Sequence, residues 1–246
     1  MSTRITSDPT AEPRVLVVHH DHVSPGGPVA DRFARRGWTV VDHVVVPADH
    51  FHAPGVTTEF PDFAGFDAVV VLGSYWSAYD HELIGSWVRP EIEQLRRADA
   101  AGVPVLGICF GGQLLAAAHG GSVARSAGPE IGWTDLETDD DTLVPGGPWF
   151  EWHYDRWQLP PGATELARNP AASQAFALRR NLALQFHPEL TAASLAGWLG
   201  NGGAAEAAAR GIDVSLLIAR TSALAPDAAR RAGALVDGFL AVTARP

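Results

Sequence analysis

The chain has 246 residues, with 18 basic against 28 acidic side chains, and the resulting net charge of −10 argues against a nucleic-acid partner, because phosphate contacts need clustered Lys and Arg. Its 46% hydrophobic and 19% charged residues exclude a disordered chain, and the absence of a signal-like leader or a long apolar run predicts no membrane partner. One cysteine can form neither an internal disulfide nor a zinc cluster, which fits a cytoplasmic location.

The first half of the chain alternates short apolar runs with helical patterns. We interpret residues 1–13 as a flexible N-terminal tail. Buried parallel strands are predicted at 14–18, 38–46, 67–72 and 104–108, and helices at 29–36, 81–101 and 112–119. Parallel strands need helical crossovers. The order therefore predicts an α/β fold with three layers, in which helices flank a mostly parallel central sheet.

The second half changes character. Between residues 122 and 186 several short β-like runs are separated by Pro, Gly and Asp turn signals, which predicts an antiparallel extension of the sheet. A helical pattern resumes at 191–199, and 204–246 is expected to form a helical extension of two or three amphipathic helices. No linker divides the chain, so we expect a single domain over 14–246.

The most informative stretch is Gly107-Ile108-Cys109-Phe110-Gly111-Gly112-Gln113. A strand leads directly into Cys109, and glycines then open a helix, as in sharp turns that present a nucleophile. A helix N-terminus favours a negatively charged sulfur and stabilises an oxyanion. The alternative interpretation is an inert buried cysteine, which is the commoner fate of a single one.

A second candidate element is Gln185-Phe186-His187-Pro188-Glu189, which follows an apolar run. His187 and Glu189 are two residues apart, so an extended backbone points both side chains the same way. Pro188 favours that extension. Glu189 is therefore placed to orient the imidazole toward a thiol, although a polar strand end explains the tripeptide equally simply.

A third strand ends at Gly73, whose backbone N–H is a candidate oxyanion donor. All three elements lie at the ends of predicted strands, and ligands of open α/β sheets bind beyond the carboxyl ends of strands. The residues alone therefore predict a Cys–His–Glu acyl-transfer site with a thioester intermediate.

These motifs resemble those of the class I glutamine amidotransferases, whose nucleophile and His-x-Glu segments residues 104–113 and 185–189 match. The resemblance covers roughly residues 14–200 and is greatest to the stand-alone subgroup related to the amidotransferase domain of GMP synthase. Three further segments agree, at 129–133, 152–155 and 169–176. The resemblance implies a flavodoxin-like fold with no cofactor.

The resemblance also implies an activity, which is hydrolysis of the glutamine side-chain amide through a γ-glutamyl thioester. Cys109 would attack, His187 would move protons, and Glu189 would orient His187. The N–H groups of Gly73 and Phe110 would form the oxyanion hole. Four further residues would hold the glutamine, namely Gln113, Trp152, Tyr154 and Asp155.

Three functions remain open from the sequence. The chain contains no ATP-binding motif and no acceptor domain, so it either delivers ammonia to a separate synthase subunit or acts alone on γ-glutamyl compounds. A non-catalytic binding protein that keeps the fold is the third. In the family that this chain resembles, the oxyanion strand usually ends in a Gly-Gly-Pro-like loop. Here the bulky Tyr75 and Trp76 follow Gly73-Ser74, and we expect them to reshape the pocket and alter substrate choice.

The run His19-His20-Asp21-His22 has the residue types of a metal site and follows the first strand. A metal needs ligands that converge from several segments, and adjacent residues of one loop rarely suffice. We therefore interpret this run as structural or surface residues and predict no metal site.

Overall fold

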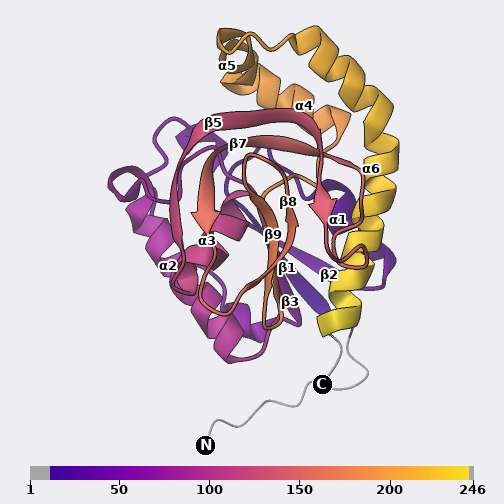
Figure 1. Ribbon diagram of the computed structural model, residues 1–246. Coiled ribbons are helices and arrows are strands. Elements are labelled where there is room, and N and C mark those ends of the chain that lie inside the picture. The colour runs from indigo at the N-terminus through magenta and orange to yellow at the C-terminus, as the bar shows by residue number, and fades with distance from the viewer. Residues whose placement is uncertain (1–11, 244–246) are drawn as a thin grey trace, which may run out of the picture.

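An eight-stranded sheet forms the centre of the computed structural model, which describes residues 12–243 (Figure 1). The strand order is β2-β1-β3-β4-β10-β9-β8-β6, with the first five strands parallel and the last three joined by antiparallel pairs. The predicted α/β fold with an antiparallel extension is confirmed, whereas most of the predicted tail lies outside the described residues. The strands are β1 (Arg14–His19), β2 (Thr39–Val44), β3 (Ala68–Val71), β4 (Val105–Ile108), β6 (Glu137–Thr138), β8 (Thr164–Arg168), β9 (Ser173–Leu178) and β10 (Asn181–Leu184).

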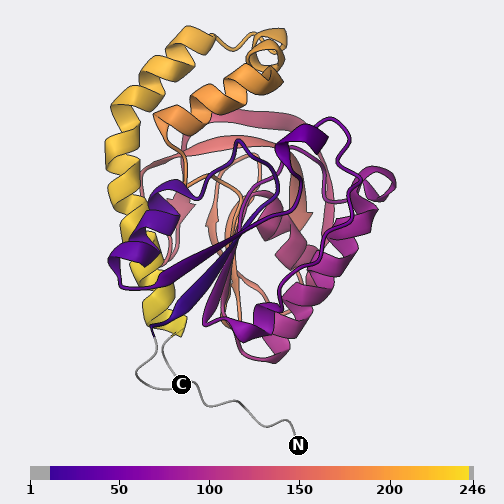
Figure 2. The ribbon, with the colours of Figure 1, turned by 180° about the vertical axis from the view of Figure 1, so that it is seen from behind.

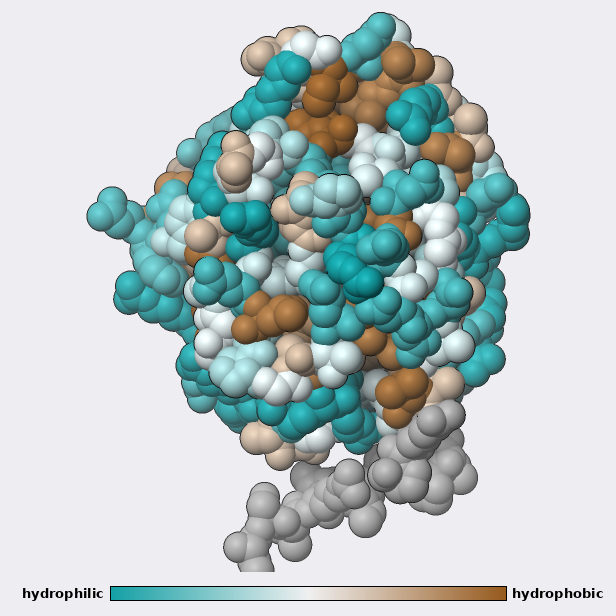
Figure 3. All heavy atoms as spheres, viewed as in Figure 1, coloured by the Kyte–Doolittle hydropathy of each residue, from teal (hydrophilic) through white to brown (hydrophobic). Residues whose placement is uncertain are grey.

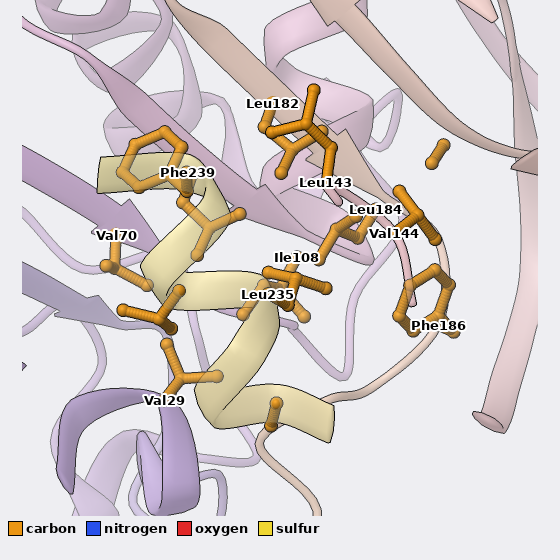
Figure 4. Close-up of a cluster of buried hydrophobic side chains, with 14 of the residues drawn as sticks. Val29, Val70, Ile108, Leu143, Val144, Leu182, Leu184, Phe186, Leu235 and Phe239 are labelled. Atoms are coloured by element: carbon orange, nitrogen blue, oxygen red, sulfur yellow. The ribbon is translucent and has the colours of Figure 1, made fainter. Parts of the chain in front are cut away.

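Helices cover both faces of this sheet. One face packs against α1 (Gly27–Arg35) and α6 (Val214–Thr243), and the other packs against α2 (His81–Ala100) and α3 (Phe110–Ala118). Every residue of β3, β4 and β10 is buried, because both faces of these strands are covered. Figure 4 shows the first interface, where Leu235 and Phe239 of α6 meet strand side chains such as Ile108.

Two long strands form a separate antiparallel ribbon, β5 (Ser122–Asp135) and β7 (Pro148–Gln158). These runs were expected in the sheet extension, and that detail was wrong. The ribbon instead arches between the central strands and α4 (Ala192–Trp198) (Figure 1). The burial pattern of β7 alternates over its second half, and aromatic side chains of the ribbon pack with α4 and α6. It joins the strand ends through the His187 N–H, which donates to the Phe150 carbonyl at 2.8 Å.

The C-terminal segment forms two helices, α5 (Ala204–Ala209) and the 30-residue α6, which confirms the expected helical extension. Figure 2 shows α6 along one side of the sheet. The helix is continuous through Pro226 because buried residues on both sides of the proline anchor it to the fold. Within residues 12–243 no helix is both long and apolar enough to cross a bilayer. The remaining helical segments are η1 (Ala48–His50), η2 (Phe63–Gly65) and η3 (Leu199–Gly203).

The face shown in Figure 3 is mostly hydrophilic, and hydrophobic residues gather at the end of the molecule where α4, α5 and α6 meet. The exposed apolar side chains of α6 include Leu216 and Ile218. Single exposed apolar residues are normal on a globular domain.

Candidate active site

The expected nucleophile lies at a sharp turn between β4 and α3. Cys109 has φ 50° and ψ −104°, a left-handed conformation that L side chains rarely adopt. The glycines beside it permit the tight crossing. A Cβ on Gly111 would lie 2.1 Å from the Val71 carbonyl oxygen, and one on Gly107 would lie 2.6 Å from the Gly111 backbone. Strain of this kind at a non-glycine residue is typical of functional sites.

Cys109 is 6% exposed and lines a cavity of about 230 Å³ at the carboxyl ends of the central strands. Two polar groups approach its sulfur. The Trp152 carbonyl oxygen lies 4.0 Å away, and the Gln185 side-chain amide donates to the sulfur at 3.6 Å. The cavity gives the sulfur access to a small substrate.

His187 and Glu189 form a buried pair just after β10. The His187 Nδ1 lies 2.7 Å from a Glu189 carboxylate oxygen, and the two side chains are 5% and 1% exposed. The Trp198 ring packs edge-on against the imidazole, with ring centroids 4.9 Å apart. Because Nδ1 is held by the carboxylate, Nε2 is the nitrogen left for the reaction.

Charge and burial oppose each other at this imidazole. Burial lowers the pKa of His187, but the negative charges of Glu189 and of the Cys109 thiolate raise that pKa well above the usual histidine value. The arrangement therefore favours the imidazolium form of His187 beside Cys109.

The third strand end meets the same cavity. A Cβ on Gly73 would lie 3.1 Å from His187 Cε1 and 3.7 Å from Cys109 Cβ, so Gly73 lies beside both side chains. Phe110 is the first residue of α3 and also lines the cavity. Both residues expected to supply oxyanion donors are thus next to Cys109.

The four expected substrate residues all line the cavity, but two are committed to other partners. The Asp155 carboxylate accepts hydrogen bonds from the Ser77 and Tyr79 hydroxyls at 2.6 and 2.9 Å. The Gln113 amide donates to the Asp155 carbonyl and to Gln185. These two residues shape the pocket wall, and their amide and carboxylate atoms are not all free for a ligand.

The other two substrate residues present their rings. Trp152 is half-buried and packs against Trp198, with ring centroids 6.1 Å apart. The Tyr154 ring has the guanidinium carbons of Arg125 and Arg210 at 5.0 and 4.7 Å from its centroid. Desolvation, followed by the effect of nearby Glu206, raises the pKa of the Tyr154 phenol to about 12, so it is a neutral donor.

A buried polar cluster that was not anticipated from the sequence lies behind this wall. His153 contacts Glu130 at 3.0 Å and Glu151 at 3.4 Å, and its other ring nitrogen lies 2.9 Å from the Asp155 carbonyl. Burial lowers the pKa of His153, but the two carboxylates raise it to about 10. The sequence held only one indication of this cluster, which is that charged residues occupy positions of a strand whose side chains point inward.

The His19–His22 run is distributed among different partners. The His19 Nε2 lies 2.8 Å from an Asp42 oxygen, whereas His20 is fully buried and points under the third strand end. Across the part of the chain that the structure describes, no three His, Cys, Asp or Glu side chains are placed to hold a metal ion.

The N-terminal turn of α1 touches the expected triad acid. Gly27 has φ +46°, and a Cβ there would lie 2.1 Å from the Glu189 carbonyl oxygen. We expect Gly27→Ala to destabilise the fold by about 2–4 kcal/mol and to lower activity by displacing Glu189. Thermal unfolding would show a Tm roughly 5–15 °C lower.

Gly37→Ala is the matched control for this prediction. Gly37 also has positive φ (+79°), but a Cβ added there would meet no atom within 4 Å. Gly37→Ala should therefore lower the free energy of unfolding only by the backbone strain, about 1–2 kcal/mol, and should leave the activity unchanged. Equal effects of the two substitutions would contradict the close contact at Glu189.

The fold and the site together define a class of protein. A positive-φ cysteine at a strand-to-helix turn, with a buried His–Glu pair at the neighbouring strand end, is the arrangement of α/β proteins with a nucleophile elbow. The family model described as "Glutamine amidotransferase class-I" matches residues 29–196. The chain therefore belongs to the class I glutamine amidotransferase family, and the resemblance seen in the sequence is confirmed.

Individual relatives agree with this family. The chain is 38% identical over 189 residues to a GMP synthase [glutamine-hydrolyzing] of Aeropyrum pernix, and the match covers 72% of this chain and 33% of that protein. A crystallised glutamine amidotransferase of Thermotoga maritima superposes with a TM-score of 0.80 at 26% identity, covering 94% of this chain and 99% of that one. A second, from Methylobacillus flagellatus, has the same TM-score at 23% identity, covering 94% and 96%.

The chain spans about a third of the length of the GMP synthase it matches. The likeness to the Methylobacillus protein supports the fold alone. What the whole GMP synthases act on is therefore a property of those proteins, and for this chain it supplies hypotheses.

Proposed function

We propose that this protein hydrolyses the side-chain amide of glutamine to glutamate and ammonia, with Cys109, His187 and Glu189 as the catalytic triad. The observation that carries the proposal is the position of a strained cysteine and a buried His–Glu pair on either side of Gly73, at one cavity. The family relationship favours glutamine as the substrate.

In the first half-reaction the Cys109 thiolate attacks the amide carbon, and a C–S bond forms. The carbonyl electrons move to the oxygen, which lies beside the N–H groups that follow β3 and β4. The His187 imidazolium then gives its Nε2 proton to the amide nitrogen. The C–N bond breaks, ammonia leaves, and a γ-glutamyl thioester remains.

In the second half-reaction a water molecule replaces ammonia. The neutral His187 takes a proton from this water, whose oxygen attacks the thioester carbon. The C–S bond breaks and releases glutamate and the thiolate. His187 regains its proton, and Glu189 holds its ring throughout.

A synthase acceptor for the ammonia is part of this proposal. The GMP synthase that the chain matches is about three times as long as the shared region, and that protein is a glutamine-hydrolysing synthase. This supports a separate subunit that uses the ammonia released at Cys109.

The proposal is tested by incubating the purified chain with glutamine and measuring glutamate and ammonia. A γ-glutamyl adduct on Cys109, trapped by acid quench and found by mass spectrometry, is the expected intermediate. A glutamine-mimicking diazoketone should alkylate the same sulfur. No turnover and no labelling of Cys109 would instead support a non-catalytic protein that keeps the fold.

A second candidate is hydrolysis of γ-glutamyl compounds by the chain alone. It is favoured by an aromatic wall at the cavity mouth, where Phe51 contacts Tyr75 and Trp76 with ring centroids 5.3 and 5.6 Å apart. Tyr75 is 60% exposed. Ammonia needs no such surface as a leaving group, whereas a larger amine gains contact area from it.

We therefore expect Tyr75→Ala to lower kcat/KM for γ-glutamyl-p-nitroanilide by about 3- to 30-fold, which is the usual range for one lost aromatic contact. Hydrolysis of glutamine itself should change less than about twofold, because ammonia does not reach the ring. Tyr75→Phe is the control, since it keeps the ring and removes only the hydroxyl. An equal loss for both substrates in Tyr75→Ala would reject the aromatic wall as a leaving-group site.

A further inference from the structure

His20 is a fully buried histidine at the end of the first central strand, directly beneath the turn that follows β3. Its partner Glu91, on α2, is equally buried. Neither side chain lines the cavity. Burying an ionisable pair carries a desolvation cost that offsets much of its attraction, so such a pair adds little to stability by itself.

The imidazole is held at both nitrogens. Its Nε2 lies 3.1 Å from each Glu91 carboxylate oxygen, and its Nδ1 lies 2.9 Å from the Gly73 carbonyl oxygen. A carbonyl only accepts, so Nδ1 must carry the hydrogen and donate it. Glu91 thus fixes the ring, and the ring fixes the carbonyl of Gly73.

This contact is the main restraint on the Gly73–Ser74 peptide. The preceding residue is tied to the sheet, since the Leu72 N–H donates to Val18 and the Leu72 carbonyl accepts from the Gly111 N–H. Among residues 12–243, no other hydrogen bond reaches the main-chain atoms of Gly73 or Ser74.

The orientation of this peptide sets which donors face the cavity. The described chain has no cis peptide bonds, so the Ser74 N–H points opposite to the Gly73 carbonyl and away from His20. Gly73 and Ser74 both line the cavity, and Gly73 lies beside Cys109 and His187. The expected donor is the N–H of Gly73 itself, which belongs to the preceding peptide. Rotation of the Gly73–Ser74 peptide would displace that N–H through the Cα atom that the two peptides share.

His20 also touches the other side of the expected oxyanion hole. Its ring meets the Phe110 ring edge-on, with centroids 4.6 Å apart, and stacks against Trp87 on α2 at 5.6 Å. One buried imidazole therefore contacts both segments that carry the expected donors.

We propose that His20 is a positioning residue for the oxyanion hole, and that Glu91 holds it in the orientation that fixes the Gly73–Ser74 peptide. The inference rests on the proposed function, since it assigns a role in the same hydrolysis. The pair acts through the backbone and touches no substrate.

Isosteric double variants separate this role from simple packing. His20→Leu/Glu91→Leu leaves no buried charge and removes the donor to Gly73. His20→Asn/Glu91→Leu has nearly the same shape, but the Asn amide nitrogen occupies the place of Nδ1 and keeps the donor. His20→Gln keeps the contact with Glu91 and loses the donor to Gly73, because its longer side chain places the amide at the position of Nε2.

The Leu double variant should lower kcat for glutamine by about 10- to 100-fold, since a displaced donor costs less than the roughly 10²–10³ of a deleted one. Its KM should stay within about twofold of the wild type. The Asn variant should recover most of kcat, and His20→Gln should not. Glutamate γ-semialdehyde, whose adduct with Cys109 places an oxygen in the hole, should lose affinity in parallel with kcat.

A loss of kcat that is equal in the Asn and Leu double variants would overturn the proposal, as would a wild-type kcat in both. If the Leu double variant does not fold, the comparison of His20→Gln with the Asn double variant decides by the same criterion.

A measurement without turnover keeps this test apart from the proposed function. The NMR amide resonance of Ser74 should stay as sharp as in the wild type in the Asn variant, and should broaden in His20→Leu/Glu91→Leu and in His20→Gln. A Ser74 resonance that stays equally sharp in the variants that lack the donor would overturn the inference. A wild type that hydrolyses neither glutamine nor a γ-glutamyl amide would reject the proposed function, while this resonance still decides the role of His20.

Discussion

Cys109→Ala is expected to lower kcat for glutamine hydrolysis by about 10⁴- to 10⁶-fold, the range found when a nucleophile is removed from a catalytic triad. Cys109 is the sole cysteine, and His187 lies close to it across Gly73, with Nε2 unoccupied by any other group of the described chain. Without the sulfur, no thioester forms, and the reaction reverts to direct attack by water. Ammonia release at saturating glutamine, followed through glutamate dehydrogenase, measures the loss.

The variant should keep its fold, because Ala occupies the same space near Cβ and bears the same positive φ as Cys109. Its Tm should therefore lie within a few degrees of the wild type. Cys109→Ser serves as a second variant that keeps a polar atom at the turn. Hydrolysis that persists undiminished in both purified variants would show that another group carries out the reaction.

The core of the site was predictable because its signals are local. Glycines on both sides of Cys109 show a turn that a side chain would block, and the two-residue spacing of His187 and Glu189 points both side chains one way. The convergence of these segments followed from a general property of parallel sheets, whose carboxyl ends share one edge.

The missed features depend on residues far apart in the chain. His20 meets its partners across 53 and 71 residues, and the Asp155 carboxylate meets the Ser77 hydroxyl across 78. A run of histidines after a strand looks the same whether it lies on a surface or supports a turn. Contacts between residues so far apart in the chain form only in the packed fold, and no local sequence pattern indicates them.

The β5–β7 ribbon illustrates a similar limit. The second half of β7 alternates buried and more exposed residues, as expected for antiparallel pairing, but alternation does not say which strand is the neighbour. The ribbon brings Trp152, Tyr154 and Asp155 over the nucleophile, and thereby forms a cavity wall that the central sheet lacks. The pocket is therefore a product of the tertiary arrangement, whereas the nucleophile turn is a product of the local sequence.

Glu189→Gln is expected to lower kcat/KM by about 10²- to 10⁴-fold, the upper value being that of the corresponding change in a serine triad. The 2.7 Å contact with Nδ1 both orients the imidazole and stabilises its positive charge. A glutamine side chain keeps the size and one acceptor, and removes the charge. The loss of kcat/KM therefore measures how far the charge of Glu189 stabilises and orients the His187 imidazole, because the packing around the side chain hardly changes.

The pH profile of kcat/KM shows in which direction Glu189→Gln shifts the pKa of His187. Glu189 and the thiolate raise the pKa of His187 against the lowering by burial, so the active imidazolium persists to alkaline pH in the wild type. Removing one of the two negative charges lowers that pKa, and the alkaline limb of kcat/KM must move to lower pH. Glu93→Gln, an exposed carboxylate of α2, is the matched control and should leave the profile unchanged. An alkaline limb that moves upward, or stays in place, would show that Glu189 does not hold the charge of His187.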